Sequence, residues 1–486
     1  MSFPHDRPIR SSLFGAFMSA LIASAVILAA AALAHASATL LLEEPYGHMG
    51  FFTGTGHAAV YLSNICADDP RTLRPCAEGE TGTVLSRYDG VNGYDWLAVP
   101  LIPYLYAVDR PEDIPLFADA KMVAFLRDSY RRKHFETIVP DNADGSSPGG
   151  NWYQLTGSSY DRTIYGFEIE TTPEQDAALI RKLNESPNRS HFHLLSRNCA
   201  DFAKDIINFY YPKTLHRSVI SDAGITTPKQ ISKMLVKFNQ HHPELAFSRL
   251  VIAQVPGSMP RSSNPKGVVE SFLKSKKYIV PSAIASPIFA GCVFAVYVGT
   301  GAGRFQPDRD AMVFNPGSDP EPPIASKDRK AYQRELKQLL AQSDPSASRS
   351  NVDKTWGRLQ SKAKTDFDAE HTPILKMQVG AQQVRIGATA ENVLNGGASP
   401  QLAQQIIAAR LQSELRHAPP NGLSQTQLSR DWNLLQRTMS QSTLAQDMRD
   451  HEEITSSESK AQSDSFVNAS DTADSVQAQT DGPLKP

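Results

Sequence analysis

The chain has 486 residues, more than one typical domain needs, and its composition changes near residue 304, which predicts two regions. Its 49 basic and 51 acidic side chains give a formal net charge of −2. This balance, without a basic patch interleaved with aromatic residues, argues against nucleic-acid binding. The sequence has no glycine-rich phosphate loop and no His/Cys cluster with metal-ligand spacing, so we expect no cofactor and no metal.

The N-terminus is typical of an export signal. Arg7 and Arg10 precede a stretch without charged residues from 11 to 42, which contains small-residue cleavage motifs at 34–38. Because the apolar part is also long enough for an uncleaved anchor, we interpret residues 1–38 as a signal peptide or an N-terminal membrane anchor. Basic residues ahead of it predict that the following domain lies on the exported side of the cell membrane.

A short strand is predicted over 57–62, after the flexible sequence Thr53-Gly54-Thr55-Gly56. His57 at its start is a candidate general base, although a histidine beside glycine is also common in turns and cores. The next strand is predicted at 82–85, and Ser86 or Asp89 could orient the imidazole from there. These residues are candidates because a catalytic base needs a partner that fixes its ring.

Cys66 and Cys76 flank a loop that contains proline and aspartate. An exported domain permits a disulfide between them, although spacing alone does not fix the distance between their Cα atoms. Further elements are expected in chain order. They are a helix over 118–135 with a solvated basic face, a strand at 164–170, a capped helix at 172–184 and a strand at 191–196.

The sequence Asn198-Cys199-Ala200-Asp201-Phe202 is the strongest chemical signal. Asn198 is a preferred helix N-cap, which puts Cys199 in the first turn, where the helix dipole favours a thiolate. Such a cysteine can titrate well below the free value of about 8.5. Backbone N–H groups near Asn198 and Ala200 could also hold an oxyanion. The alternative is a small buried cysteine without chemistry.

The order of the two motifs, with the histidine strand first and the Asn-Cys helix later, resembles the circularly permuted papain-like thiol superfamily. This group includes the lecithin:retinol acyltransferase-like and permuted NlpC-like families. The closest resemblance is to an envelope family that includes a lipoprotein N-acyltransferase, over about residues 43–257. It implies an α+β domain over 39–257, Cys199 as nucleophile, His57 as base and a thioester intermediate. The third catalytic residue stays open, because the second histidine common in the acyltransferase group is absent at 85–90.

A second run without charged residues, 278–303, is long enough to cross a bilayer and is predicted as a transmembrane segment. The alternative is a buried helix or strand pair, since two prolines interrupt its first half. Residues 304–450 are expected to be mostly helical, with a strand pair at 376–386, and the acidic, serine-rich residues 451–486 are expected to be disordered. The expected architecture is therefore an α+β, permuted papain-like domain with membrane segments and a mostly helical or disordered C-terminal region.

Three functions are compatible with these residues. The first is an exported, membrane-tethered Cys-His enzyme that transfers an acyl group through a thioester, on a membrane lipid or an acylated protein. The second is a cell-wall amidase or peptidase with the same dyad, and the third a non-catalytic binding or scaffold module. A polar groove beside Cys199 would favour hydrolysis, and an apolar tunnel would favour acyl transfer. A Cys199 sulfur beyond hydrogen-bond reach of His57 would favour the scaffold. Oligomeric state is not predicted.

Overall fold

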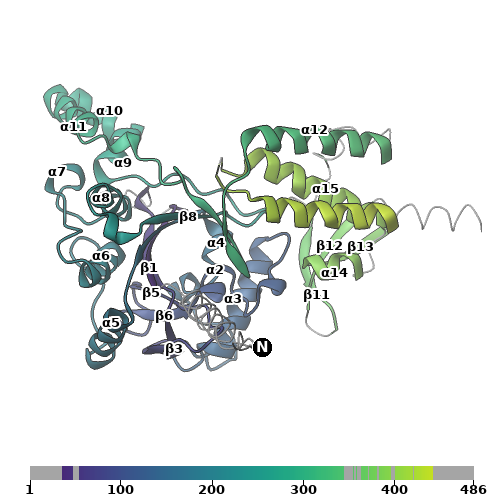
Figure 1. The fold of residues 1–486 in the computed structure, drawn as a ribbon, viewed down its shortest axis with the longest axis horizontal. Coiled ribbons are helices and arrows are strands. Elements are labelled where there is room, and N and C mark those ends of the chain that lie inside the picture. Colours follow the sequence, from purple (N-terminus) through teal and green to yellow (C-terminus); the bar gives the residue numbers. More distant parts are fainter. Residues whose placement is uncertain are drawn as a thin grey trace, which may run out of the picture.

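The computed structural model describes residues 36–46, 54–343, 354, 357, 363–369, 372–379, 382–395, 400–419 and 421–441. A curled sheet of eight strands, in the order β10-β9-β8-β7-β1-β2-β5-β6, forms its centre (Figure 1). The strands are β1 (Ser37–Glu43), β2 (His57–Leu62), β5 (Thr83–Ser86), β6 (Leu97–Pro100), β7 (Ile164–Glu170), β8 (Ser248–Ile252), β9 (Met312–Asn315) and β10 (Ser318–Glu321). All neighbours pair antiparallel except β8 and β9, which are parallel.

Strand β1 lies in the middle of this sheet and is buried along its whole length. Its apolar run continues the charge-free N-terminal stretch, because a strand covered on both faces needs no alternation of polar residues. The strand begins at Ser37, so the last two residues assigned to the leader belong to the sheet. The rest of the predicted leader, 1–35, lies outside the described residues. At the other end of β1, Glu43 pairs with His57 of β2.

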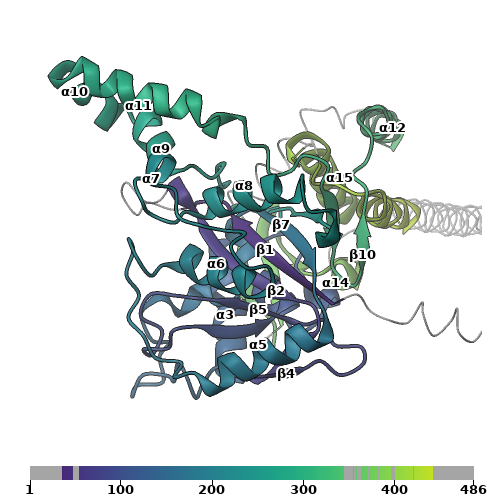
Figure 2. The same cartoon turned by 60° about the vertical axis from the view of Figure 1, so that its left-hand side comes forward.

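Helices cover both faces of the sheet (Figure 2). One face packs against α5 (Pro173–Glu185), α6 (Cys199–Tyr210) and α8 (Pro228–Asn239), and the other against α2 (Leu101–Tyr106), α3 (Ala120–His134) and α4 (Ser158–Asp161). Capping boxes begin α5, α6 and α8. Short helices at α7 (Val219–Asp222) and α9 (Val268–Lys274) lie between the larger ones. The strand expected at 191–196 is absent: a turn closed by a bridge between His193 and Arg197 takes its place.

The basic face expected on α3 is buried at Arg127 and Arg131, whereas Arg132 and Lys133 are exposed. Arg127 pairs with Asp161 at 2.5 Å. Arg131 is fully buried and pairs with Asp128 at 2.7 Å and with Asp141. A buried guanidinium needs such partners because an unpaired charge is costly to desolvate. The expectation of a solvated basic face is therefore wrong for two of its residues, which connect α3 to neighbouring loops.

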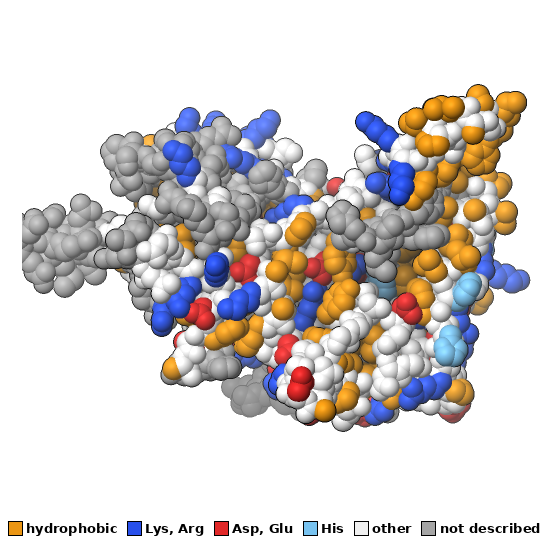
Figure 3. Space-filling model, turned by 180° about the vertical axis from the view of Figure 1, so that it is seen from behind, with side chains coloured by type: hydrophobic (Ala, Val, Ile, Leu, Met, Phe, Trp, Pro, Cys, Tyr) orange, Lys and Arg blue, Asp and Glu red, His pale blue; other side chains and the backbone are white. Residues whose placement is uncertain are grey.

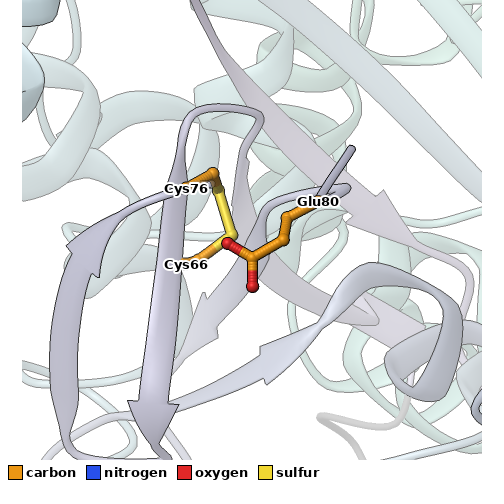
Figure 4. A group of neighbouring side chains, drawn as sticks. All are labelled: Cys66, Cys76 and Glu80. Atoms are coloured by element: carbon orange, nitrogen blue, oxygen red, sulfur yellow. A yellow bond between two sulfur atoms is a disulfide. The ribbon is translucent and has the colours of Figure 1, made fainter. Parts of the chain in front are cut away.

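Cys66 and Cys76 form a disulfide that closes the hairpin of β3 (Ile65–Asp69) and β4 (Thr72–Pro75) (Figure 4). Glu80 lies beside the bridge, and these three residues resemble a metal-ligand cluster in composition. The two sulfur atoms are bonded to each other, and Arg74 donates hydrogen bonds to both oxygens of Glu80, at 2.6 and 2.8 Å. Because metal ligation needs free thiolates, this cluster is a structural feature.

The predicted transmembrane segment is corrected by the structure. Residues 276–299 form two short helices, α10 (Lys276–Ala285) and α11 (Pro287–Gly299). The helical conformation is interrupted between them at Ser286, which caps α11. Across the described ranges, no helix combines the length and apolarity needed to cross a membrane. Proline at the first position of α11 explains the break, since it starts a helix well but cannot continue one.

The C-terminal region contains the strand pair expected at 376–386 and more strands besides. Its β9 and β10 extend the central sheet, and β11 (Lys364–Phe367), β12 (Pro373–Val379) and β13 (Gln382–Gly387) form a second sheet. Helices α12 (Ser326–Ser343), α14 (Ala390–Asn395), α15 (Pro400–His417) and a helical stretch over 425–441 complete it. Residues 451–486 lie outside the described part. The expected α+β papain-like class with membrane segments is thus replaced by a mixed α/β fold around a curled eight-stranded sheet.

Candidate active site

Cys199 is the first residue of α6 and lies at the end of the helix that carries the positive dipole. Asn198 caps this helix, since its side chain accepts a hydrogen bond from the N–H of Asp201 at 3.0 Å. The Asp201 carboxylate accepts one in return from the N–H of Asn198 at 3.3 Å. The N–H groups of Cys199 and Ala200 lie in the first turn, where the helix offers them no carbonyl partner. An oxyanion site needs such donors.

Polar contacts fix the position of this helix tip. The amide of Asn198 donates to the carbonyls of Leu194 at 2.9 Å and of Thr226 at 3.0 Å. The buried Asp201 carboxylate accepts hydrogen bonds from the Thr226 hydroxyl at 2.6 Å and from Arg217 at 3.0 Å. The sulfur of Cys199 is therefore held by a capped helix start that is tied to two flanking loops.

Arg87, which follows β5, connects the same tip to the sheet. Its guanidinium donates to Asp95 at 2.8 and 2.9 Å and to the carbonyl of Asn198 at 3.4 Å. Asp95 also pairs with Arg197 at 3.0 Å. This buried arginine was not among the predicted site residues, although its place directly after Ser86 was an available signal.

His57 stands at the start of β2, and Ser86 at the end of β5 lies beside it. The Nε2 atom of His57 and the hydroxyl of Ser86 are 2.7 Å apart. The same hydroxyl lies 3.3 Å from the carbonyl of Ala58. The ring of Tyr88 stacks on the imidazole, with centroids 5.4 Å apart. Since Nε2 faces Ser86, Nδ1 is the ring nitrogen that remains to interact with Cys199, whose charge acts on His57.

The charges of the two groups are mutually stabilised. Desolvation alone would raise the pKa of Cys199, but the charge and hydrogen bond of His57, helped by the N–H of Ala58, lower it below its usual range. Desolvation alone would lower the pKa of His57, but the charge and hydrogen bond of Cys199, followed by the charge of Glu43, raise it. These opposite shifts favour a thiolate beside an imidazolium, the state in which a cysteine is nucleophilic.

Glu43 is a second residue that the sequence analysis missed. Its side chain is 0% exposed and pairs with Arg162 at 3.1 Å. It accepts hydrogen bonds from the hydroxyls of Ser158, at 3.1 Å, and of Tyr104. Its position at the end of an apolar run was a possible signal, because a carboxylate that continues a buried strand requires partners.

The remaining candidates are placed as follows. Ser86 lies in the site, whereas Asp89 is exposed, and its backbone carbonyl accepts a hydrogen bond from Asn151. The structure thus brings Cys199, His57 and Ser86 together and leaves Asp89 outside. The catalytic roles of these residues stay predictions.

A large cavity of about 1100 Å³ lies at the same end of the sheet but is separate from the dyad. It lies between the sheet and the C-terminal helices, and neither Cys199 nor His57 lines it. Its lining is mixed and includes Glu44, Tyr165, Arg261, Arg410 and Glu414. This cavity is therefore not the apolar tunnel beside Cys199 that would have favoured acyl transfer.

No family model matches the chain, and no curated protein matches it. Among solved structures, the crystal structure of the type VI secretion system effector TseH aligns over 46% of this chain and 94% of its own, with 13% sequence identity and a TM-score of 0.21. A likeness of this size carries no argument about the fold or the function.

Proposed function

We propose that the protein is a cysteine-dependent enzyme that transfers or hydrolyses acyl groups through a thioester. Cys199 is the nucleophile, and His57 is the general base. The observation that carries the proposal is the placement of Cys199, at the capped start of α6, beside His57, at the start of β2. The two groups are close enough that each shifts the pKa of the other toward its charged form. The capped start of α6 adds a fixed sulfur, and the first-turn N–H groups there have no carbonyl partner within the helix. The resemblance of the two motifs to permuted thiol acyltransferases supports the same chemistry.

The reaction follows from these positions. The sulfur of Cys199 attacks the acyl carbonyl carbon while His57 holds the thiol proton, and the N–H groups of Cys199 and Ala200 stabilise the oxyanion. The intermediate collapses to a thioester, and His57 gives the proton to the leaving alcohol or amine. An acceptor amine or water then loses a proton to His57 and attacks the thioester. The acceptor takes the acyl group, and Cys199 is released.

The resemblance favours a membrane lipid or an acylated protein as substrate, and it does not choose between an amine and water as acceptor. Amide hydrolysis, as in cell-wall amidases and peptidases, is the second candidate. The observation in its favour is that Cys199 is half-buried and lies outside the large cavity, so water can reach the thioester.

The test is to identify what becomes attached to the sulfur. The purified full chain and its Cys199→Ala variant are incubated with phospholipid vesicles, with a diacylated lipopeptide, or with cell-wall fragments, and their intact masses are compared. A hydroxylamine-sensitive fatty-acyl mass on the wild type alone supports transfer. Release of peptide without an acyl adduct supports hydrolysis. No adduct and no turnover under any condition contradicts the proposal and favours a binding module.

A further inference from the structure

Glu43 and His57 face each other at the end of the sheet. They are paired residues of the antiparallel strands β1 and β2, so their side chains leave the same face of the sheet. Glu43 is fully buried, and its carboxylate is fixed by an ion pair with Arg162 and by hydrogen bonds from Tyr104 and Ser158. A buried carboxylate is costly unless it is paired. The presence of a buried carboxylate beside a proposed catalytic base therefore needs an explanation.

We propose that Glu43 is a positioning residue of the thiol site, whose fixed negative charge beside His57 holds the imidazole in its protonated form after it has taken the proton of Cys199. It touches neither the sulfur nor, in the proposed reaction, the acyl group. It acts through His57. The inference rests on the proposed function only because Glu43 acts on the protonation of the Cys199–His57 pair.

The charged and titratable groups around His57 come from several elements. Cys199 faces it from α6, Glu43 from β1 and Tyr88 from the segment after β5, while Arg162 precedes β7. Arg162 opposes Glu43, since its charge lowers the pKa of His57, but the charge of Glu43 has the larger effect.

Arg162 is itself shared among several acidic groups. Besides Glu43, the phenols of Tyr46 and Tyr104 and the carboxylate of Asp161 act on it, and its guanidinium lies 4.3 Å from the ring centroid of Tyr46. Arg162 therefore interacts with several groups besides Glu43, and the charge of Glu43 also acts on Cys199.

The direction of the effect follows from the sign of the charge. A negative charge disfavours deprotonation of either group, so Glu43 raises the pKa of both His57 and Cys199. When Glu43 is replaced by Gln, the thiolate should form at lower pH, and His57 should lose its proton at lower pH. A residue with a purely structural role would reduce the amount of active protein without moving either inflection.

The test is the pH profile of Cys199 alkylation by iodoacetamide, in full-length protein that also carries Cys292→Ser. In Glu43→Gln we expect both inflections to move to lower pH by about one unit, the size expected from a unit charge several ångströms away. Glu43→Asp keeps the charge and should restore the wild-type inflections. Glu44→Gln is the matched control, because this neighbouring carboxyl is engaged by Ser262 and Tyr165 and should leave the profile unchanged.

A lone Arg162 in Glu43→Gln can prevent folding, which circular dichroism and thermal melting would show. The double variant Glu43→Gln/Arg162→Gln then replaces the ion pair by two neutral amides, and it should keep a smaller shift in the same direction. A folded Glu43→Gln or double variant with a wild-type profile overturns the inference, and so does an equal shift in Glu44→Gln. Alkylation needs no substrate, so a failure of the proposed function would leave this result intact.

Discussion

Helices α6 and α11 each carry one free cysteine and begin with a polar cap, yet they differ in burial and in the position of the cysteine. Cys199 is the first residue of α6, whose apolar face is buried against the sheet. Cys292 lies in the middle of α11, which has no buried residue. Large apolar side chains of the α10–α11 hairpin are exposed, as the hydrophobic patch at the upper right of Figure 3 shows.

This difference shows which features make a thiol chemically useful. Both helices are rich in apolar residues, so hydrophobicity does not separate them. Position does, because only the start of a helix offers unpaired N–H groups and the positive dipole end to a sulfur. Tertiary contacts add the imidazole of His57. We therefore expect Cys199, and not Cys292, to carry the reactivity of the protein.

The largest expected effect tests this comparison directly. Cys199→Ala should abolish the rapid phase of iodoacetamide labelling and the p-nitrophenol burst from p-nitrophenyl butyrate, because it removes the nucleophile. Cys292→Ala should change neither. Peptide mapping of the labelled protein identifies the site. Retention of the burst in Cys199→Ala, or its loss in Cys292→Ala, would reverse the assignment.

The next effect concerns the base. In His57→Ala, desolvation still raises the pKa of Cys199, while the charge and hydrogen bond that lower it are gone. The inflection of the alkylation profile should therefore move to higher pH. The rate at neutral pH should fall about tenfold for each unit of that shift. His193→Ala is the control, since this exposed histidine bonds Ser196 in the turn before α6. Equal effects of the two variants would refute the role of His57.

A smaller effect is expected from the two helix caps. Asn198→Ala should lower the free energy of unfolding by about 1–2 kcal/mol, because this buried residue caps α6 and bonds two loop carbonyls. Ser286→Ala should cost about 0.5 kcal/mol or less, since its hydroxyl caps the exposed α11 at 3.4 Å. Urea unfolding of both variants measures this. Equal losses would show that the cap of α6 carries no additional structural role.

The sequence was most informative where local chemistry decides the structure. The capped start of α6, the proline-started helix after Thr172, and the strand that begins at His57 all follow from short-range rules. The expected disulfide is also present. These features need only neighbours in the chain.

The errors had one local and one long-range source. The run at 278–303 has the length and composition of a membrane span, but a cap and a proline divide it into two helices. The partners of Glu43 are 61 and 115 positions away, at Tyr104 and Ser158. No periodic pattern encodes such contacts, so the buried network around Glu43 could not be predicted.

The smallest effect concerns Ser86. Its substitution tests the orientation of His57 separately from the charges around the Cys199–His57 pair. Its hydroxyl lies 2.7 Å from Nε2 of His57 but carries no charge. A neutral hydrogen bond contributes about 1 kcal/mol, so Ser86→Ala should slow the p-nitrophenol burst about fivefold. The inflections of the alkylation profile should stay in place, because the charges around the dyad are unchanged. Ser86→Thr, which keeps a hydroxyl, should recover most of the rate. A displaced profile in Ser86→Ala would mean that Ser86 acts on the charge of His57 and not on its orientation.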